Sequence, residues 1–144
     1  MTEVAFHFNA ADKWSYACRL LRKAVLKGSR VAVVGEQALL EQLDRALWSF
    51  SDTDFIPHCV TPCDADMLAA SPLVLCPSLD SSPHQQVLVN IGAAVPAGFE
   101  RFERLIEVVG TDGADRLDSR RRWKHYRDRG YKVAGHDLAL KEAL

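Results

Sequence analysis

Short apolar runs alternate with longer amphipathic segments along this chain. Residues 4–8 form an apolar run that predicts an opening strand, and the segment after it predicts a helix that ends near Gly28. The apolar positions of that helix are Trp14, Ala17, Cys18, Leu21, Ala24 and Val25. Residues 30–34 are a continuous run rich in β-branched side chains. Because such a run suits a strand buried on both faces, it predicts a central parallel strand with helical crossovers.

A second helix is predicted from about Glu36, with one residue that does not fit its pattern. The expected core face consists of Leu39, Leu43, Ala46, Leu47 and Phe50. Trp48 points roughly 180° away from Leu39. A large aromatic side chain off the core face is therefore left to be explained.

The rest of the chain continues the alternation of strands and helices. Further strands are predicted at residues 55–60, 73–76, 87–91, 105–109 and 131–134, with a loop at 78–84 and a short helix around 99–104. A long basic helix follows Gly113. This order predicts an α/β fold, a three-layer αβα sandwich with a largely parallel sheet, in a single domain of residues 1–144.

Composition narrows the class of protein. The chain has 144 residues, 48% of them hydrophobic, which is enough to bury a core, and it has no apolar run of membrane-spanning length. The first ten residues lack the basic and apolar regions of a signal peptide. We therefore expect a cytoplasmic protein whose four cysteines, Cys18, Cys59, Cys63 and Cys76, are reduced thiols.

Charge is distributed very unevenly. Residues 116–132 hold eight Lys or Arg and two Asp, whereas the remainder holds ten basic and seventeen acidic residues. On a helix, Arg116, Arg120, Trp123 and Arg127 fall within about 60°. Guanidinium groups beside an indole suit an anion next to an apolar group, either a nucleic acid or a peptide with an acidic and aromatic end. The third interpretation is a solvated helix face whose Trp packs on the domain.

The sequence does not assemble a catalytic centre or a cofactor site. A nucleotide-binding sheet would carry a phosphate loop, yet only Gly35 follows the second strand, so we expect no nucleotide hydrolysis and no cofactor. His58, Cys59 and Cys63 could offer three metal ligands, but no fourth follows at suitable spacing, and buried thiols are the favoured interpretation. Trp48 with Phe55, Ile56 and Pro57 suggests either a protein interface or a loop folded over the indole.

Three segments resemble the chi subunit family of bacterial DNA polymerase III. These are the opening VAFHF, the ALW that ends the second helix with FIPH after it, and RRWKHYRDRGY near the C-terminus. The resemblance covers essentially the whole chain. It implies an α/β domain without a phosphate loop and a non-catalytic accessory subunit of the holoenzyme, which bridges the clamp loader to single-stranded-DNA-binding protein.

The resemblance assigns partners to both surfaces. It implies that Val109, Arg116, Arg120, Trp123, Lys124 and Arg127 bind the acidic C-terminal tail of single-stranded-DNA-binding protein. It also implies that Leu47, Trp48, Phe55, Ile56 and Pro57 face the psi subunit, although the helical phase places Leu47 in the core. DNA would then be reached only indirectly. Two rival hypotheses are direct binding of nucleic acid by the basic helix and a degenerate nucleotide-binding enzyme.

Overall fold

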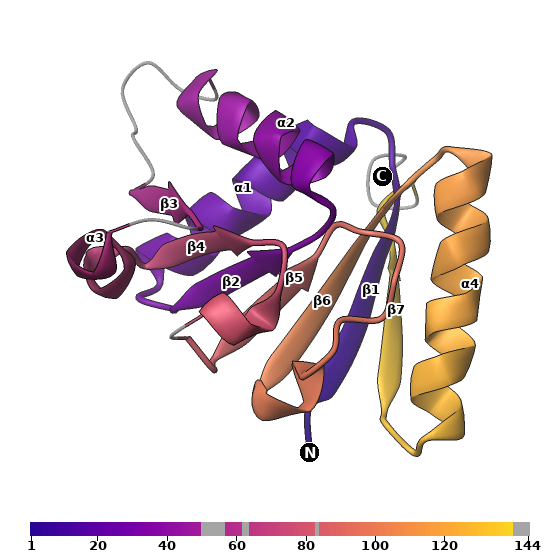
Figure 1. The fold of residues 1–144 in the computed structure, drawn as a ribbon. Helices are drawn as coiled ribbons and strands as arrows, with labels where there is room; N and C mark the ends of the chain where they lie inside the picture. Colours follow the sequence, from indigo (N-terminus) through magenta and orange to yellow (C-terminus); the bar gives the residue numbers. More distant parts are fainter. Residues whose placement is uncertain (50–56, 62–63, 83, 140–144) are drawn as a thin grey trace.

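A parallel sheet organises the chain (Figure 1). The computed structural model describes residues 1–49, 57–61, 64–82 and 84–139. In that part of the chain the strands are β1 (Glu3–Ala10), β2 (Val31–Val34), β3 (His58–Val60), β4 (Leu73–Cys76), β5 (Val87–Asn90), β6 (Arg104–Gly110) and β7 (Val133–Asp137). The helices are α1 (Lys13–Leu26), α2 (Gln37–Ser49), α3 (Ala65–Ala70) and α4 (Gly113–Asp128), with short 3-10 turns η1 (Leu79–Ser81) and η2 (Phe99–Arg101).

The strand order places the two ends of the sequence side by side. The seven strands run in the order β3-β4-β2-β5-β6-β1-β7, and every described pairing is parallel. β1 lies between β6 and β7, with Phe6 opposite Gly135 and Phe8 opposite Asp137. The predicted parallel sheet is confirmed, and the first strand of the chain is flanked by its last two.

Helices cover both faces of the sheet, which gives the three predicted layers (Figure 1). One face packs against α1 and α2, whose buried residues include Leu21, Leu40 and Leu43. The other face packs against α4 and the segment around η2, where Tyr126, Phe99 and Phe102 are buried. Side chains alternate along β6, so Val108 joins the first core and Val109 the second.

The first helix ends before Gly28, as its sequence predicts. Asp12 caps α1 by accepting a hydrogen bond from the Ser15 N–H at 3.1 Å, and Gly28 follows the helix with φ of +85°. In α2 the core face is shifted by one residue from the prediction. Leu40, Leu43 and Leu47 are buried, whereas Leu39 is only partly buried. The buried face of α2 therefore includes Leu40, which the prediction left out, while Leu39 and Ala46 pack against the same core only partly buried.

Other element boundaries differ from the predictions for local reasons. The last strand was predicted at 131–134 but begins at Val133, because residues 129–131 still close the end of α4. Gly130 has φ of +86°, and the Tyr131 N–H bonds to the Tyr126 carbonyl at 3.1 Å. The predicted short helix is a single 3-10 turn, and α3, capped by Asp64, was missed because it is so short. Residues 55 and 56 of the predicted 55–60 strand lie outside the described part, which resumes at Pro57, and β3 begins at His58.

No helix in the described residues combines the length and apolar character that a membrane crossing needs.

Candidate functional site

A pocket of about 670 Å³ lies between α4 and the strands β1, β6 and β7. Its position follows from the topology, because β1 separates β6 from β7 and α4 packs against both of those strands. The lining residues are Phe6, Phe8, Asn9, Val109, Gly110, Arg116, Ser119, Arg120, Trp123, Gly135 and Asp137. The pocket therefore joins residues from the two ends of the sequence.

An indole forms the apolar part of this pocket. Trp123 is partly buried, and its ring centroid lies 5.0 Å from that of Phe6. Gly135 makes room for it, since a Cβ built there would lie 3.2 Å from the indole and 3.3 Å from the Phe8 ring. Val109, 1% exposed, adds an aliphatic wall. The result is an apolar surface that suits one ligand side chain.

Two guanidinium groups line the pocket, and they differ in their hydrogen-bond and ion-pair partners. Arg116 donates from Nη2 to Asn9 Oδ1 at 3.0 Å, which fixes its direction. Arg120 is exposed and makes no ion pair with any described residue. Arg116 is held by Asn9, whereas Arg120 has no ion-pair partner in the described part of the chain, so the pocket offers an anion one oriented donor and one further positive charge.

A carboxylate also lines this cationic pocket. Asp137 Oδ1 accepts hydrogen bonds from Asn9 Nδ2 at 2.9 Å and from the Ala139 N–H at 3.0 Å. Asn9 itself has φ of 62°, and the pairing of β1 with β6 shifts between His7 and Ala10. Asn9 and Asp137 are not predicted from the sequence, because nothing in the linear pattern places β1 beside β7.

Lys13 and Asp115 secure the start of α4. Lys13 Nζ lies 3.0 Å from Asp115 Oδ2, and the same oxygen accepts the Gly110 N–H at 2.8 Å. Asp112 caps the helix by accepting from the Asp115 N–H. These contacts hold the beginning of α4 against the end of β6, so the backbone at Arg116 is fixed in position.

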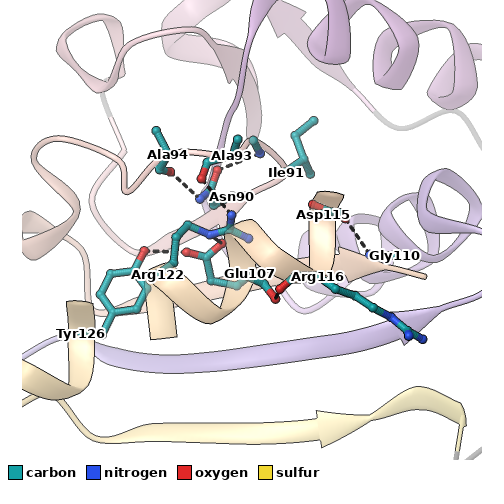
Figure 2. A network of polar contacts seen from close by, with 12 residues as sticks. Asn90, Ile91, Ala93, Ala94, Glu107, Gly110, Asp115, Arg116, Arg122 and Tyr126 are labelled. Carbon is teal, nitrogen blue, oxygen red and sulfur yellow. Dashed lines mark hydrogen bonds and ion pairs between the residues drawn. The ribbon is translucent and has the colours of Figure 1, made fainter. Parts of the chain in front are cut away.

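Arg122 belongs to the basic run of the sequence but is not available to a partner (Figure 2). Its Nε lies 3.0 Å from Glu107 Oε1, and Nη1 donates to the Ala93 carbonyl at 2.9 Å. The Tyr126 hydroxyl donates to the other oxygen of Glu107. Burial raises the pKa of Glu107, and the positive charge of Arg122 opposes that rise. This cluster fastens α4 to the sheet.

The remaining basic residues that the resemblance singles out lie outside the pocket lining. Lys124 and Arg127 are exposed on α4 and make no ion pair with the described part of the chain. The structure thus gathers Val109, Arg116, Arg120 and Trp123 around one cavity and leaves Lys124 and Arg127 beside it.

A second exposed surface lies at the end of α2. Trp48 is 62% exposed, and its ring contacts that of His58 at 5.6 Å. His58 Nε2 lies 2.8 Å from Asp44 Oδ1, and Pro57 is exposed. Leu47 is 2% exposed, which confirms the core position given by the helical phase. Phe55 and Ile56 lie outside the described residues.

A carboxylate stands at the start of α2, where nucleotide-binding sheets bind phosphate. Glu36 precedes α2, and its Oε1 accepts the Ala93 N–H at 3.1 Å. Its other oxygen would lie 2.9 Å from a Cβ built on Gly92. A carboxylate held at the start of this helix repels a phosphate group.

The described residues do not gather metal ligands. His58 bonds to Asp44 beside α2, whereas Cys59 points to the opposite face of β3 and is buried with the α4-side core. No group of three His, Cys, Asp or Glu suited to a metal occurs in the described ranges. Cys63, the third predicted ligand, lies outside them. Burial raises the pKa of Cys18 to about 11 and that of Cys76 to about 12.

Comparison with known proteins shows one consistent likeness. A family model described as DNA polymerase III chi subunit, HolC, matches residues 1–134. The chain is also similar to the DNA polymerase III subunit chi of Pseudomonas aeruginosa, with 32% identity over 143 residues that cover 96% of this chain and 98% of that protein.

Proposed function

The chain belongs to the DNA polymerase III chi subunit family, and from that premise we propose that it is a non-catalytic accessory subunit of the bacterial holoenzyme. In this proposal one surface binds the psi subunit of the clamp loader. The other binds the acidic C-terminal tail of single-stranded-DNA-binding protein. The chain then connects the polymerase assembly to coated single-stranded DNA without itself binding the strand.

The single observation that carries the proposal is the pairing of an apolar wall with two arginines in one pocket. A tail that ends in an apolar residue and a free carboxylate would place its last side chain against Trp123 and Val109. Its carboxylate would then meet Arg116 and Arg120, which line the same cavity. A nucleic-acid strand has no such end, so an apolar wall beside two arginines favours a chain terminus that carries both an apolar side chain and a carboxylate.

The charges around the pocket determine the expected strength and salt dependence. An exposed ion pair contributes at most about 1 kcal/mol and is screened by salt. One tail should therefore bind at roughly micromolar strength, and more weakly as salt rises. Lys124 and Arg127 add positive charge outside the pocket, where they would attract the aspartates that precede the end of the tail.

The second contact of the proposal is the end of α2. Trp48 is 62% exposed, its ring contacts that of His58, and Pro57, the residue before His58, is exposed as well. An exposed indole next to apolar residues is typical of the anchor of a protein interface. Trp48→Ala should reduce co-purification with the psi subunit, whereas Arg120→Ala should leave it unchanged, because Arg120 stands at the α4 pocket.

A peptide titration tests the tail pocket. A fluorescent peptide with the acidic tail sequence is titrated with the wild type, Arg120→Ala and Arg121→Ala, at low and moderate salt. Arg121 is the matched control, because it stands next to Arg120, its side chain is 74% exposed and it does not line the pocket. We expect Arg120→Ala to weaken binding at least tenfold more than Arg121→Ala does.

Two further ligands separate the proposal from direct binding of nucleic acid. A tail peptide with a C-terminal amide lacks the terminal carboxylate, so it should bind much more weakly than the free acid. An oligonucleotide tests phosphate binding by the basic helix. If the amide binds as well as the acid and the oligonucleotide binds more tightly than either, the tail pocket is refuted and the basic helix is a nucleic-acid surface.

A further inference from the structure

We propose that Asn9 is a positioning residue that holds Arg116 over the pocket, and that Asp137 anchors Asn9. This inference rests on the proposed function, since it concerns how the same pocket receives an anionic chain end. It adds two residues that neither the basic helix nor the family resemblance had suggested. Both come from the strands opposite α4.

The side-chain amide of Asn9 has one hydrogen-bond donor and one acceptor as partners, which fixes its orientation. Its Oδ1 accepts from Arg116 Nη2 at 3.0 Å, and its Nδ2 donates to Asp137 Oδ1 at 2.9 Å. Asp137 Oδ1 is itself held by the Ala139 N–H at 3.0 Å. A reversed amide would set a donor against the guanidinium and an acceptor against the carboxylate. The chain from Asp137 to Arg116 therefore has one favoured arrangement.

The backbone of β1 presents Asn9 to this chain. Asn9 has φ of 62°, in the left-handed region that Asn tolerates better than most residues. The register between β1 and β6 shifts at this point, between His7 and Ala10. Such irregularities at strand ends change the direction in which a side chain points. Here the side chain concerned is one that lines the pocket.

Asn9 also keeps the charge of Arg116 available. Asp137 is an acid in the lining of a pocket that should take an anion, and a direct ion pair would neutralise Arg116. With the amide as an intermediate, Arg116 donates to a neutral oxygen while the carboxylate is satisfied by two N–H donors. Arg116 is thus oriented without losing its positive charge.

The physical benefit is preorganisation. An arginine side chain has several rotatable bonds that must be fixed when it grips a ligand, and a fixed arginine has less to lose. Arg120, which makes no ion pair with the described chain, does not have this advantage. Arg116 would therefore set the orientation of the bound carboxylate, and Arg120 would mainly contribute charge.

A double-mutant cycle tests the inference with the acidic tail peptide as the probe. The variants are Asn9→Gly, Arg116→Ala and the double variant, and glycine is chosen because it adopts positive φ without strain. When Arg116 is present, we expect Asn9→Gly to weaken peptide binding about three- to tenfold. In the Arg116→Ala background it should change binding less than about twofold. Equal weakening in both backgrounds would overturn the inference.

Substitution of Asp137 separates positioning from simple electrostatics. Asp137→Asn retains an oxygen for Asn9 and Ala139 but loses the charge, whereas Asp137→Ala loses both. Positioning predicts that the Ala variant binds the peptide at least threefold more weakly than the Asn variant. If the two variants bind equally, Asp137 acts only through its charge and does not anchor Asn9.

A second readout keeps the inference distinct from the proposed function. The Nε–Hε signal of Arg116 in an ¹⁵N NMR spectrum of the free protein reports its order without any ligand. We expect a dispersed signal in the wild type and an averaged one in Asn9→Gly. If the wild type fails to bind the peptide, the proposed function fails, yet this NMR difference would still establish positioning; an unchanged Arg116 signal would overturn it.

Discussion

Replacing Arg122 by Met should destabilise the fold far more than its place in a charged run suggests. The guanidinium is 2% exposed, lies 3.0 Å from Glu107, which is 0% exposed, and also donates to the Ala93 carbonyl. Removing one partner of a buried pair costs about 3–5 kcal/mol, because the other charge is left without compensation. A domain of this size is stable by only about 5–15 kcal/mol, so the variant should lose a large share of it.

The same substitution should make stability fall more steeply with rising pH than it does in the wild type. Burial already raises the pKa of Glu107 above its ordinary value, and the loss of Arg122 would raise it further. An acid whose folded pKa lies above its unfolded value is most favourable to folding when protonated. The unfolding free energy of Arg122→Met should therefore fall as pH rises from about 5 towards 8.

Urea unfolding followed by circular dichroism at several pH values measures both effects. Arg121→Met is the control, since Arg121 is 74% exposed and its pair with Asp118 spans 3.8 Å. Its effect should stay within about 0.5 kcal/mol. Equal losses in the two variants, or an Arg122 variant with no added pH dependence, would refute the reasoning about the buried pair.

Three further predictions concern other parts of the molecule. In a Cys63→Ser background, the remaining thiols should react with a disulfide reagent at pH 8 only after unfolding, because all three are buried and Cys76, with its pKa near 12, is also almost entirely protonated; rapid native labelling would contradict this. Burial lowers the pKa of His84 below its unfolded value, so wild-type stability should fall as the pH drops from the unfolded pKa towards the folded one. Urea titrations at pH 7 and 5 should show a smaller fall for His84→Gln, which has no group that titrates there. Gly135→Val should displace the Trp123 ring, detected as a change in tryptophan fluorescence, and weaken tail binding at least tenfold; an unchanged spectrum would show that the pocket adapts.

The sequence predicted the layers of the fold because its apolar pattern repeats at the spacing of each element. The run at 31–34 is buried throughout, as expected of a central parallel strand. The pattern failed where burial is slight. β7 is mostly exposed and contains Gly135 and His136, so it has no apolar alternation to mark its bounds. The six-residue helix α3 is too short for periodicity to detect.

The site was predicted in part for a comparable reason. Helical periodicity placed Arg116, Arg120 and Trp123 on one face, and the structure gathers them at one pocket. Periodicity describes one element at a time and cannot show what lies opposite it. Asn9 and Asp137 reach the pocket through strand order, which depends on contacts distant in sequence. The burial of Arg122 likewise depends on Glu107 in another strand.

The position of β1 between β6 and β7 has a consequence during protein synthesis. β1 ends at Ala10 and β6 begins at Arg104, so the first strand leaves the ribosome long before either neighbour exists. At about 5–20 residues per second, the wait is roughly 5–20 s. The pocket needs β7 as well, so it closes only when Asp137 has emerged. A nascent or prematurely terminated chain that ends before β7 therefore cannot form this pocket.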